Sequence, residues 1–450
     1  MASIASAVGA GDPHSPLSQY VAGVSELFPR PNKMRILETT IASRYDADVL
    51  PTNLGFNMKL SDRYIDFLIP GTPGSLIDLG KLVLHTSLRL TKEDNSTPLE
   101  DDQHVEFANN TAHSLFKSVQ CFLGDVAVEN NVLYGYTSYV KMLNTLSPNK
   151  LNTIGANANI TIPETGFISK VTTEYFDNAS ARHKTIMKRV KTHGMQLCTP
   201  LLLDISSLDS YLLDGISVRL RMELSSNAWL LNSPTNGDKL RLHIDSAKLL
   251  YTRLFPYPNA LHALNASLAA GNLLTSTFTK TLLKTYVLAK DQTTGTYDQP
   301  WGNVIPEKLS LIITSMEAHS GDYMLNPLYL SHGDISQITL SVNGRTVYNV
   351  PSKFPHDYAE LYHRTLDALG YHKDHLIGKE IFSKGAMICT FDLRAENLND
   401  NLPVEMNGGL RLSLNLSKGE NENRLLILFG ETVGIITVNS ERRLQCDVRA

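Results

Sequence analysis

Cysteine and tryptophan are scarce in this chain, and each shortage excludes a class of protein. The four cysteines lie far apart among 450 residues, and no Cys-x-x-Cys pair occurs. Structural zinc sites and disulfide frameworks use closely spaced or paired cysteines, so we predict neither and expect a reducing compartment. The two tryptophans are fewer than sugar-cleaving enzymes usually need to stack against their substrates.

Charged side chains are also few, and neither sign dominates. They make up 19% of the residues, below the quarter that is typical of soluble domains. The 41 Lys and Arg against 45 Asp and Glu give a net charge of −4. The chain as a whole therefore has no basic field with which to wrap nucleic acid. The low charge predicts instead that neighbouring subunits cover part of the surface.

Long apolar runs are missing as well. The longest apolar stretch, Leu425–Val438, is interrupted by Gly430, Glu431, Thr432 and Gly434, whereas a spanning helix needs about 20 consecutive apolar residues. The first residues have no basic segment followed by an apolar run. We therefore expect a protein that neither spans a membrane nor is secreted.

The chain does contain strict alternation of apolar and polar residues. The clearest examples are Leu82–Leu90, Ile216–Leu224 and Leu410–Leu416. Such alternation predicts strands with one buried face, as in an antiparallel sandwich. Parallel α/β sheets would show continuous apolar strands between amphipathic helices, and that pattern is absent.

Helical patterns are few and short. They cover Ser138–Leu146, Ala260–Leu274 and Asp357–Leu369, the last ending before Gly370, a good stop signal. The sequence therefore predicts a mostly β protein with short helices in the connections.

A weak internal repeat is the most informative feature. Residues Val119–Asn130 align without a gap on Ile338–Asn349, an offset of 219. Each copy predicts a strand, a two-residue turn (Gly124-Asp125 or Asn343-Gly344) and a return strand, and Asn-Gly is a strong type I′ hairpin signal. The same offset relates Tyr139 to Tyr358, each predicted to open a short helix.

A second correspondence follows in the same order. Asp214-Gly215 and Gly408-Gly409 each precede an alternating strand, and each strand is followed by a predicted apolar strand pair, at Leu240–Leu250 and Leu425–Val438. Elements that recur in order indicate two copies of one β-domain. The alternative is that any two β-domains share hairpins and alternating strands.

These patterns predict an all-β chain of two tandem eight-stranded jelly-roll sandwiches. A length of 450 residues suits two domains of about 200 each. The expected division is an N-terminal arm at 1–56, jelly roll 1 at 57–255 and jelly roll 2 at 256–450, with a linker at about 252–278. The long connections Leu143–Leu197 and Phe354–Lys384 suit the Greek-key crossovers of jelly rolls.

Several long segments resemble the hexon-like major capsid proteins of polinton and adintovirus-type elements. These segments are Phe67–Thr91, Thr111–Asp125, Pro200–Leu224, Ile305–Gly344 and Met406–Ser417. The resemblance runs from about residue 60 to 440, excludes the arm and includes no diagnostic catalytic motif.

The resemblance implies a structural protein of a DNA virus, located in the virion. Three copies would form a pseudo-hexameric capsomer, and such homotrimers would tile an icosahedral capsid together with minor and penton proteins. No catalytic, cofactor-binding or metal-binding residues are carried over, because the family works through surfaces. The alternatives are a two-domain jelly-roll hydrolase acting on glycans and a glycan-binding attachment protein.

The arm is mildly basic, with Arg30, Lys33, Arg35 and Arg44. One interpretation places it near the genome or an adjacent capsomer on the inner face of the shell. The other is a loosely ordered tail.

Two loops have features of ligand sites. The segment Gly71–Lys81 invites a phosphate-loop interpretation, but Ser75 stands where that motif needs Gly and Leu82 where it needs Ser or Thr. We therefore predict a loop that enters a strand. The acidic loop Glu93–Asp102 lacks the glycine and the ligand spacing of an EF-hand, so a solvated loop is favoured over a calcium site.

Histidines gather between residues 332 and 375. They are His332, His356, His363, His372 and His375, with three aspartates among them. Metal sites use such groups, but no HExxH motif or cysteine partner is present. Polar loop histidines are the favoured interpretation.

Overall fold

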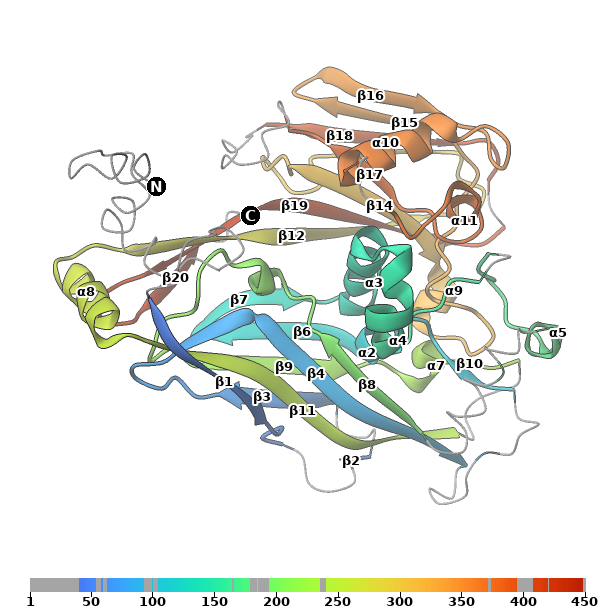
Figure 1. Ribbon diagram of the computed structural model, residues 1–450. Helices are drawn as coiled ribbons and strands as arrows, with labels where there is room; N and C mark the ends of the chain where they lie inside the picture. Colours follow the sequence, from blue (N-terminus) through green and yellow to red (C-terminus); the bar gives the residue numbers. More distant parts are fainter. Residues whose placement is uncertain are drawn as a thin grey trace, which may run out of the picture.

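The computed structural model describes residues 40–53, 58–59, 63–92, 99, 104–163, 166–178, 184, 194–234, 240–370, 374–394, 408–419 and 421–447. They form two β-sandwiches, one above the other in Figure 1. The predicted arm up to residue 39, His372 and the acidic loop apart from Leu99 lie outside the described residues.

The first sandwich consists of two facing antiparallel sheets. One sheet has the order β1-β11-β4-β8, with β2 beside β11, and the other has the order β3-β9-β6-β7. The bounds are β1 Ile41–Val49, β2 Met58–Lys59, β3 Tyr64–Ile69, β4 Leu76–Lys92, β6 Phe116–Leu123, β7 Val126–Asn131, β8 Met195–Pro200, β9 Val218–Leu224 and β11 Leu240–Pro256. Next to these sheets, β5 (Glu106–Phe107) pairs with β10 (Leu231–Asn232).

The second sandwich repeats this arrangement. One sheet has the order β12-β19-β14-β17, with β20 beside β19, and the other has the order β13-β18-β15-β16. The bounds are β12 Leu274–Leu288, β13 Thr294–Asp298, β14 Lys308–Ser315, β15 Ile335–Val342, β16 Arg345–Pro351, β17 Cys389–Asp392, β18 Leu410–Leu416, β19 Arg424–Val438 and β20 Leu444–Asp447. Strand by strand the order matches the first sandwich, so the predicted double jelly roll is confirmed.

The repeat extends to the irregularities of the ladders. The β6–β7 register shifts between Cys121 and Phe122, and the β15–β16 register shifts between Leu340 and Ser341. Each pair of positions is related by the predicted offset of 219. A bulge inserts one residue into a ladder and increases the local twist, so the two hairpins share their curvature as well as their sequence pattern.

The two hairpin turns differ in conformation. Asn343 and Gly344 both have positive φ, 51° and 78°, as the predicted type I′ turn requires. In the first hairpin Gly124 has φ of 57° and Asp125 does not have positive φ. Glycine at the first central position is the pattern of a type II′ turn.

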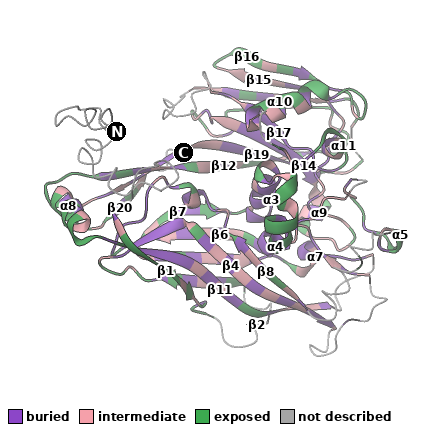
Figure 2. Cartoon of the chain, in the orientation of Figure 1, coloured by how far each residue is buried: buried purple, intermediate pink, exposed green. Residues whose placement is uncertain are grey.

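Burial follows the predicted alternation. In β9, Val218, Leu220 and Met222 are buried, while Arg219 and Arg221 point outward. β18 shows the same pattern. Figure 2 shows the buried residues concentrated between the sheets of each roll.

Helices lie in the connections, as predicted. The three longer ones are α3 (Tyr134–Thr145), α8 (Pro258–Ala269) and α10 (Ala359–Leu369). The shorter ones are α2 Thr111–Ser114, α4 Ala156–Ala158, α5 Thr173–Asp177, α7 Asn227–Leu230, α9 Met316–Ser320 and α11 Lys379–Ser383. α8 joins β11 to β12 within the predicted linker (Figure 1).

One helix prediction is partly wrong. Tyr358 immediately precedes α10, as expected, but Tyr139 lies in the middle of α3. α3 begins three residues after β7, whereas β16 ends at Pro351 and Pro355 lies in the longer connection from there to α10. Proline lacks the backbone N–H that a helix interior needs, so the second helix starts later.

Two further predictions need correction. Ile41–Val49 falls in the predicted arm, yet it is β1 and pairs with β11. β11 and β19 are single long strands and not strand pairs. Gly434 does not turn the chain: a Cβ there would lie 2.4 Å from the Phe278 ring, so this glycine permits close packing.

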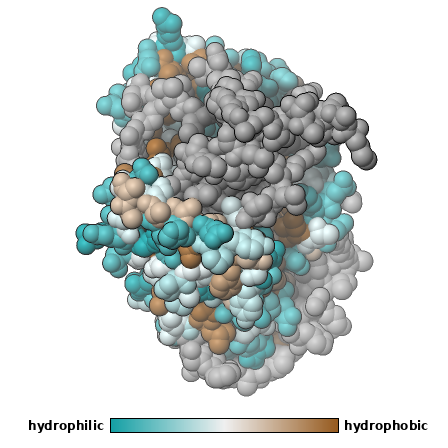
Figure 3. Space-filling view, turned by 60° about the vertical axis from the view of Figure 1, so that its left-hand side comes forward, coloured by the Kyte–Doolittle hydropathy of each residue, from teal (hydrophilic) through white to brown (hydrophobic). Residues whose placement is uncertain are grey.

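Among the described residues, no helix combines the length and the apolar character needed to cross a membrane. On the face drawn in Figure 3, the coloured surface is mostly hydrophilic, with small separate hydrophobic areas.

Candidate functional site: the seam between the rolls

Helix α3 is buried between the two rolls (Figure 1). Tyr134 and Met142 pack in the core of the first roll, while Tyr139 and Leu143 pack in the core of the second. A helix with apolar residues on opposite faces needs cover on both sides, and the two rolls supply it.

Strands of the second roll also pack against the core of the first roll. Leu274 and Phe278 of β12, Ile436 and Val438 of β19 and Leu444 of β20 all belong to the core of the first roll. The hydrophobic cores therefore interlock, and separating the rolls would expose apolar surface from both.

Polar groups also lie at this boundary between the two rolls, which we call the seam, where it runs beside β12. Asp209 binds Thr277 through its backbone N–H (3.0 Å to the carbonyl oxygen) and through its carboxylate, which accepts from the Thr277 hydroxyl at 2.7 Å. Two residues further along, the Thr279 N–H donates to Ser207 Oγ at 2.8 Å. Side chains of the first roll thus satisfy edge groups of β12 that a neighbouring strand would otherwise bind.

A buried charged cluster continues this ladder. The Asp204 carboxylate accepts from Lys141 Nζ at 2.6 Å and from both the N–H and the hydroxyl of Thr281 at 2.7 Å. Glu129 Oε2 accepts from the Asp204 N–H at 2.9 Å. The cluster joins β7, α3 and the segment after β8 to the second roll.

Burial changes the titration of Glu129. Loss of water and, to a smaller extent, the neighbouring Asp204 carboxylate raise its pKa to about 8, against the opposing effects of Lys141 and of two backbone N–H groups. Its Oε1 has no hydrogen-bond partner within the described structure. Glu129 therefore carries a proton at neutral pH, which avoids two adjacent buried negative charges.

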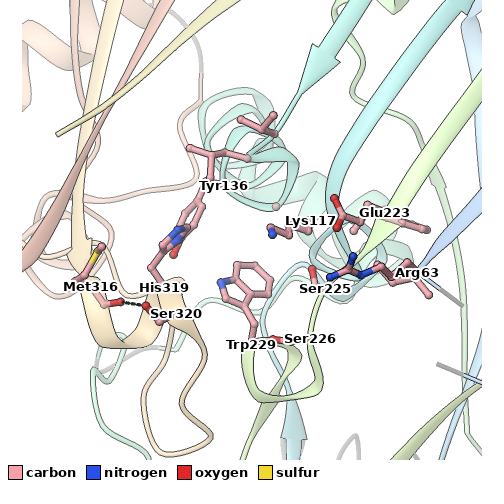
Figure 4. Close-up of a pocket in the computed structure, with 15 residues that line it drawn as sticks. Arg63, Lys117, Tyr136, Glu223, Ser225, Ser226, Trp229, Met316, His319 and Ser320 are labelled. Atoms are coloured by element: carbon pink, nitrogen blue, oxygen red, sulfur yellow. Dashed lines mark hydrogen bonds between the residues drawn. The ribbon is translucent and has the colours of Figure 1, made fainter. Parts of the chain in front are cut away.

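A cavity of about 730 Å³ opens at one end of the seam (Figure 4). The first roll contributes Arg63, Lys117 and Glu223 together with Tyr136 and Trp229, and α9 of the second roll contributes Met316, His319 and Ser320. The Tyr136 ring meets Trp229 edge-on at 5.8 Å and His319 at 5.7 Å. Gly135 permits this packing, since a Cβ there would lie 2.8 Å from the Trp229 ring.

Two of the histidines considered as metal ligands, His332 and His375, have other contacts. His332 stacks on Phe354 with ring centroids 4.7 Å apart and accepts from the Asp334 N–H at 3.0 Å. His375 Nε2 lies 3.0 Å from the Gly370 carbonyl oxygen. Within the described ranges, no group of three or more His, Cys, Asp or Glu side chains converges. The absence of site residues stays a prediction.

The segment Gly71–Lys81 leads into a strand, as predicted, but the loop ends at Ser75 and the strand begins before Leu82. The Gly74 N–H donates to Asp214 at 2.9 Å, and β4 begins at Leu76. A phosphate loop would lead into a helix, and here it leads into a strand.

Sequence reasoning missed the seam. Glu129, Lys141 and Asp204 are separated by many residues and carry no motif. One usable signal was present: Thr277, Thr279 and Thr281 alternate along β12, which indicates a polar row on one side of a strand.

The cavity does not suit the glycan-hydrolase alternative. Glycoside hydrolysis uses two carboxylates that flank the scissile bond. Among the described residues that line the cavity, Glu223 is the single carboxylate.

The fold matches solved structures of viral proteins over almost the whole chain. A chain of the Sputnik virophage, solved by cryo-EM, superposes with a TM-score of 0.60 at 11% identity, covering 98% of this chain and 94% of that one. VP54 of PBCV-1 gives 0.57 at 9% identity, covering 91% and 97%. The mavirus major capsid protein gives 0.51 at 10% identity, covering 93% and 94%.

Sequence comparisons add nothing to this likeness. No protein-family model matches the chain, and a search of curated proteins gives no match. The structural evidence is therefore the basis for classification. By its fold, the chain is a double jelly roll of the kind found in viral major capsid proteins.

Proposed function

We propose that the chain is the major capsid protein of an icosahedral virus-like shell, a structural subunit of the virion and not an enzyme. The observation that carries the proposal is the likeness to a Sputnik virophage chain over 98% of this chain and 94% of that one. Agreement over nearly the full length of both chains favours a shared architecture over a shared module.

The proposed mechanism is assembly of homotrimers. Each chain supplies two rolls of equal strand order, so three chains supply six similar corners and approach a hexagonal outline. Interlocked cores make the chain a rigid unit, which is what a repeating tile needs. We place the division between the rolls in the segment of α8, between the end of β11 at Pro256 and the start of β12 at Leu274.

Proposed partners are neighbouring capsomers and the minor and penton proteins that close the shell. Weak genome contact is proposed for the basic residues that precede β1. Arg44 is not among them, because it lies in β1, where it forms an ion pair with Asp46 at 2.9 Å.

Light scattering after size exclusion tests the proposal directly. At micromolar concentration we expect a trimer of three 49.8-kDa chains, about 150 kDa, and a near-hexagonal outline in negative stain. A monodisperse monomer contradicts the proposal. Glycan binding by a species that never forms particles would favour the attachment-protein alternative.

A further inference from the structure

The cavity at the seam has a positive rim. Arg63 and Lys117 are exposed and form no ion pair with any described residue. Figure 4 shows both side chains extending toward the space bordered by Tyr136, Trp229 and His319. Glu223 is the single carboxylate of the described lining, and its Oε2 accepts from the Ser118 hydroxyl at 2.9 Å. Two cations against one carboxylate leave one positive charge without a counterion.

The lining of the cavity is more apolar than polar. Phe116, Leu133, Trp229 and Met316 contribute to its lining. Tyr136 is only 2% exposed, and its ring packs against Trp229 and His319. The volume of about 730 Å³ lies within the range of about 300–1,000 Å³ that is usual for small-ligand sites.

We propose that this cavity binds a small amphipathic anion, an apolar body that carries one carboxylate. The carboxylate lies between Arg63 and Lys117, where it supplies the missing negative charge. The apolar body lies against Trp229 and Met316. Met316 belongs to the second roll, whereas Trp229 and the two rim cations belong to the first. The bound ligand therefore bridges the rolls and stabilises their arrangement. The inference goes beyond the capsid role and does not require it.

Trp229 is a built-in reporter of binding. The chain has two tryptophans, and Trp301 does not line the cavity, so the Trp301→Phe variant leaves Trp229 alone. Decanoate, kept below its micelle-forming concentration, is the probe, and fluorescence is the measurement. We expect a saturable change with decanoate. We expect none with acetate, which lacks the apolar body, with decanol, which lacks the charge, or with decyltrimethylammonium, which has the opposite charge.

Charge reversal at the rim tests the positioning of the carboxylate. In the Trp301→Phe background, Lys117→Glu should weaken decanoate binding about tenfold, the value of one hydrogen bond to a charged group. Lys284→Glu is the matched control, because Lys284 is exposed on β12 outside the cavity, and it should bind as the parent does. Arg63→Gln provides a second rim variant if Lys117→Glu does not fold.

Three results would overturn the proposal. The first is the absence of a saturable response to decanoate. The second is equal binding of decanol, which would show apolar partitioning without recognition of charge. The third is equal affinity in folded rim variants and in Lys284→Glu. None of these results bears on trimer formation, so the capsid proposal stands or falls separately.

Discussion

The outer faces of the two equivalent sheets, β3-β9-β6-β7 and β13-β18-β15-β16, share polar side-chain contacts but differ in the aromatic side chains that they expose. On the second roll the outward row is a network of polar side chains. Asn349 Oδ1 accepts from Gln337 Nε2 at 2.6 Å and from the Thr339 hydroxyl at 3.1 Å, and Asn415 donates to Gln337 Oε1 at 3.1 Å. The polar side chains of this face satisfy one another's hydrogen bonds, and the face suits contact with water.

On the first roll the equivalent face has polar contacts too: Gln120 Nε2 donates to Asn130 Oδ1 at 3.3 Å, and Arg221 pairs with Asp66 at 3.0 Å. In addition it exposes an aromatic and an aliphatic side chain on β3. Tyr64 and Leu68 are 43% and 42% exposed. Arg221 lies over the Tyr64 ring at 5.0 Å, and Arg219 lies over the Phe122 ring at 5.7 Å. Tyrosine, phenylalanine and arginine are the residues enriched at protein interfaces.

One register position makes the contrast concrete. Arg219 stands opposite Leu68 in the first roll, and Arg411 stands opposite Asp298, its ion-pair partner, in the second. The two rolls have the same strand order, while their outward residues differ. The core alternation maintains the fold, so the outer row is free to change with what it contacts.

The largest effect is expected where the first roll meets the second. Asp204→Ala removes the partner of Lys141 and of two Thr281 donors, and breaking a buried pair costs about 3 kcal/mol or more. Chemical denaturation measures the loss in free energy of unfolding. Asp298→Ala on the outer face of the second roll is the control and should change little, because exposed ion pairs contribute little. Equal losses would show that the seam is not specially important.

The pH dependence of stability should trace to Glu129. Its pKa of about 8 in the folded chain exceeds the ordinary glutamate value of about 4.3 in the unfolded chain. The folded state therefore binds the proton more tightly, and stability present at low pH is lost as pH rises toward 8. We expect a loss of at least about 1.4 kcal/mol, the value of one pKa unit.

Glu129→Gln should flatten this profile, because the amide stays neutral at every pH. Glu360→Gln, on the exposed side of α10 in the second roll, should leave the profile as it is. Thermal melts from pH 5 to pH 9 measure both. A profile that is equally steep in Glu129→Gln would assign the effect to another group.

Assembly should depend on the outer face of the first roll more than on that of the second. If the proposed trimer uses this face, Tyr64→Glu should weaken trimer formation by about tenfold or more, because buried tyrosines are frequent hot spots. Thr294→Glu, at the equivalent position of β13, should not weaken it. Sedimentation over a concentration series measures the difference. Equal behaviour of the two variants would place the trimer contact elsewhere.

The smallest effect should separate the two hairpins. Asn343→Ala places alanine at φ of 51° and removes the acceptor of the Gly409 N–H at 2.9 Å. We expect a loss of about 1–2 kcal/mol, since a left-handed conformation costs about that much. Asp125→Ala in the first hairpin should be nearly neutral, because Asp125 does not have positive φ. Urea titrations of the two variants give the comparison.

Local patterns in the sequence were enough for the strands, the two hairpins and their common order. Alternation has a period of two residues, so it can be recognised in any short segment and needs no knowledge of distant contacts. The errors lie where distant packing decides. The alternation in Ile41–Val49 is weak because most of that strand is exposed. Gly434 is a break in the apolar pattern, but the structure explains it by the Phe278 ring that packs against it.

The contacts of the seam could not be predicted from the sequence and were decided by the tertiary structure alone. Glu129, Asp204 and Thr281 come from three separate parts of the chain, and each is an ordinary polar residue in its own segment. They meet because α3 and the long strands of the second roll cross the first roll. A buried charge is stable only when such partners surround it, and that environment arises when the two rolls pack together.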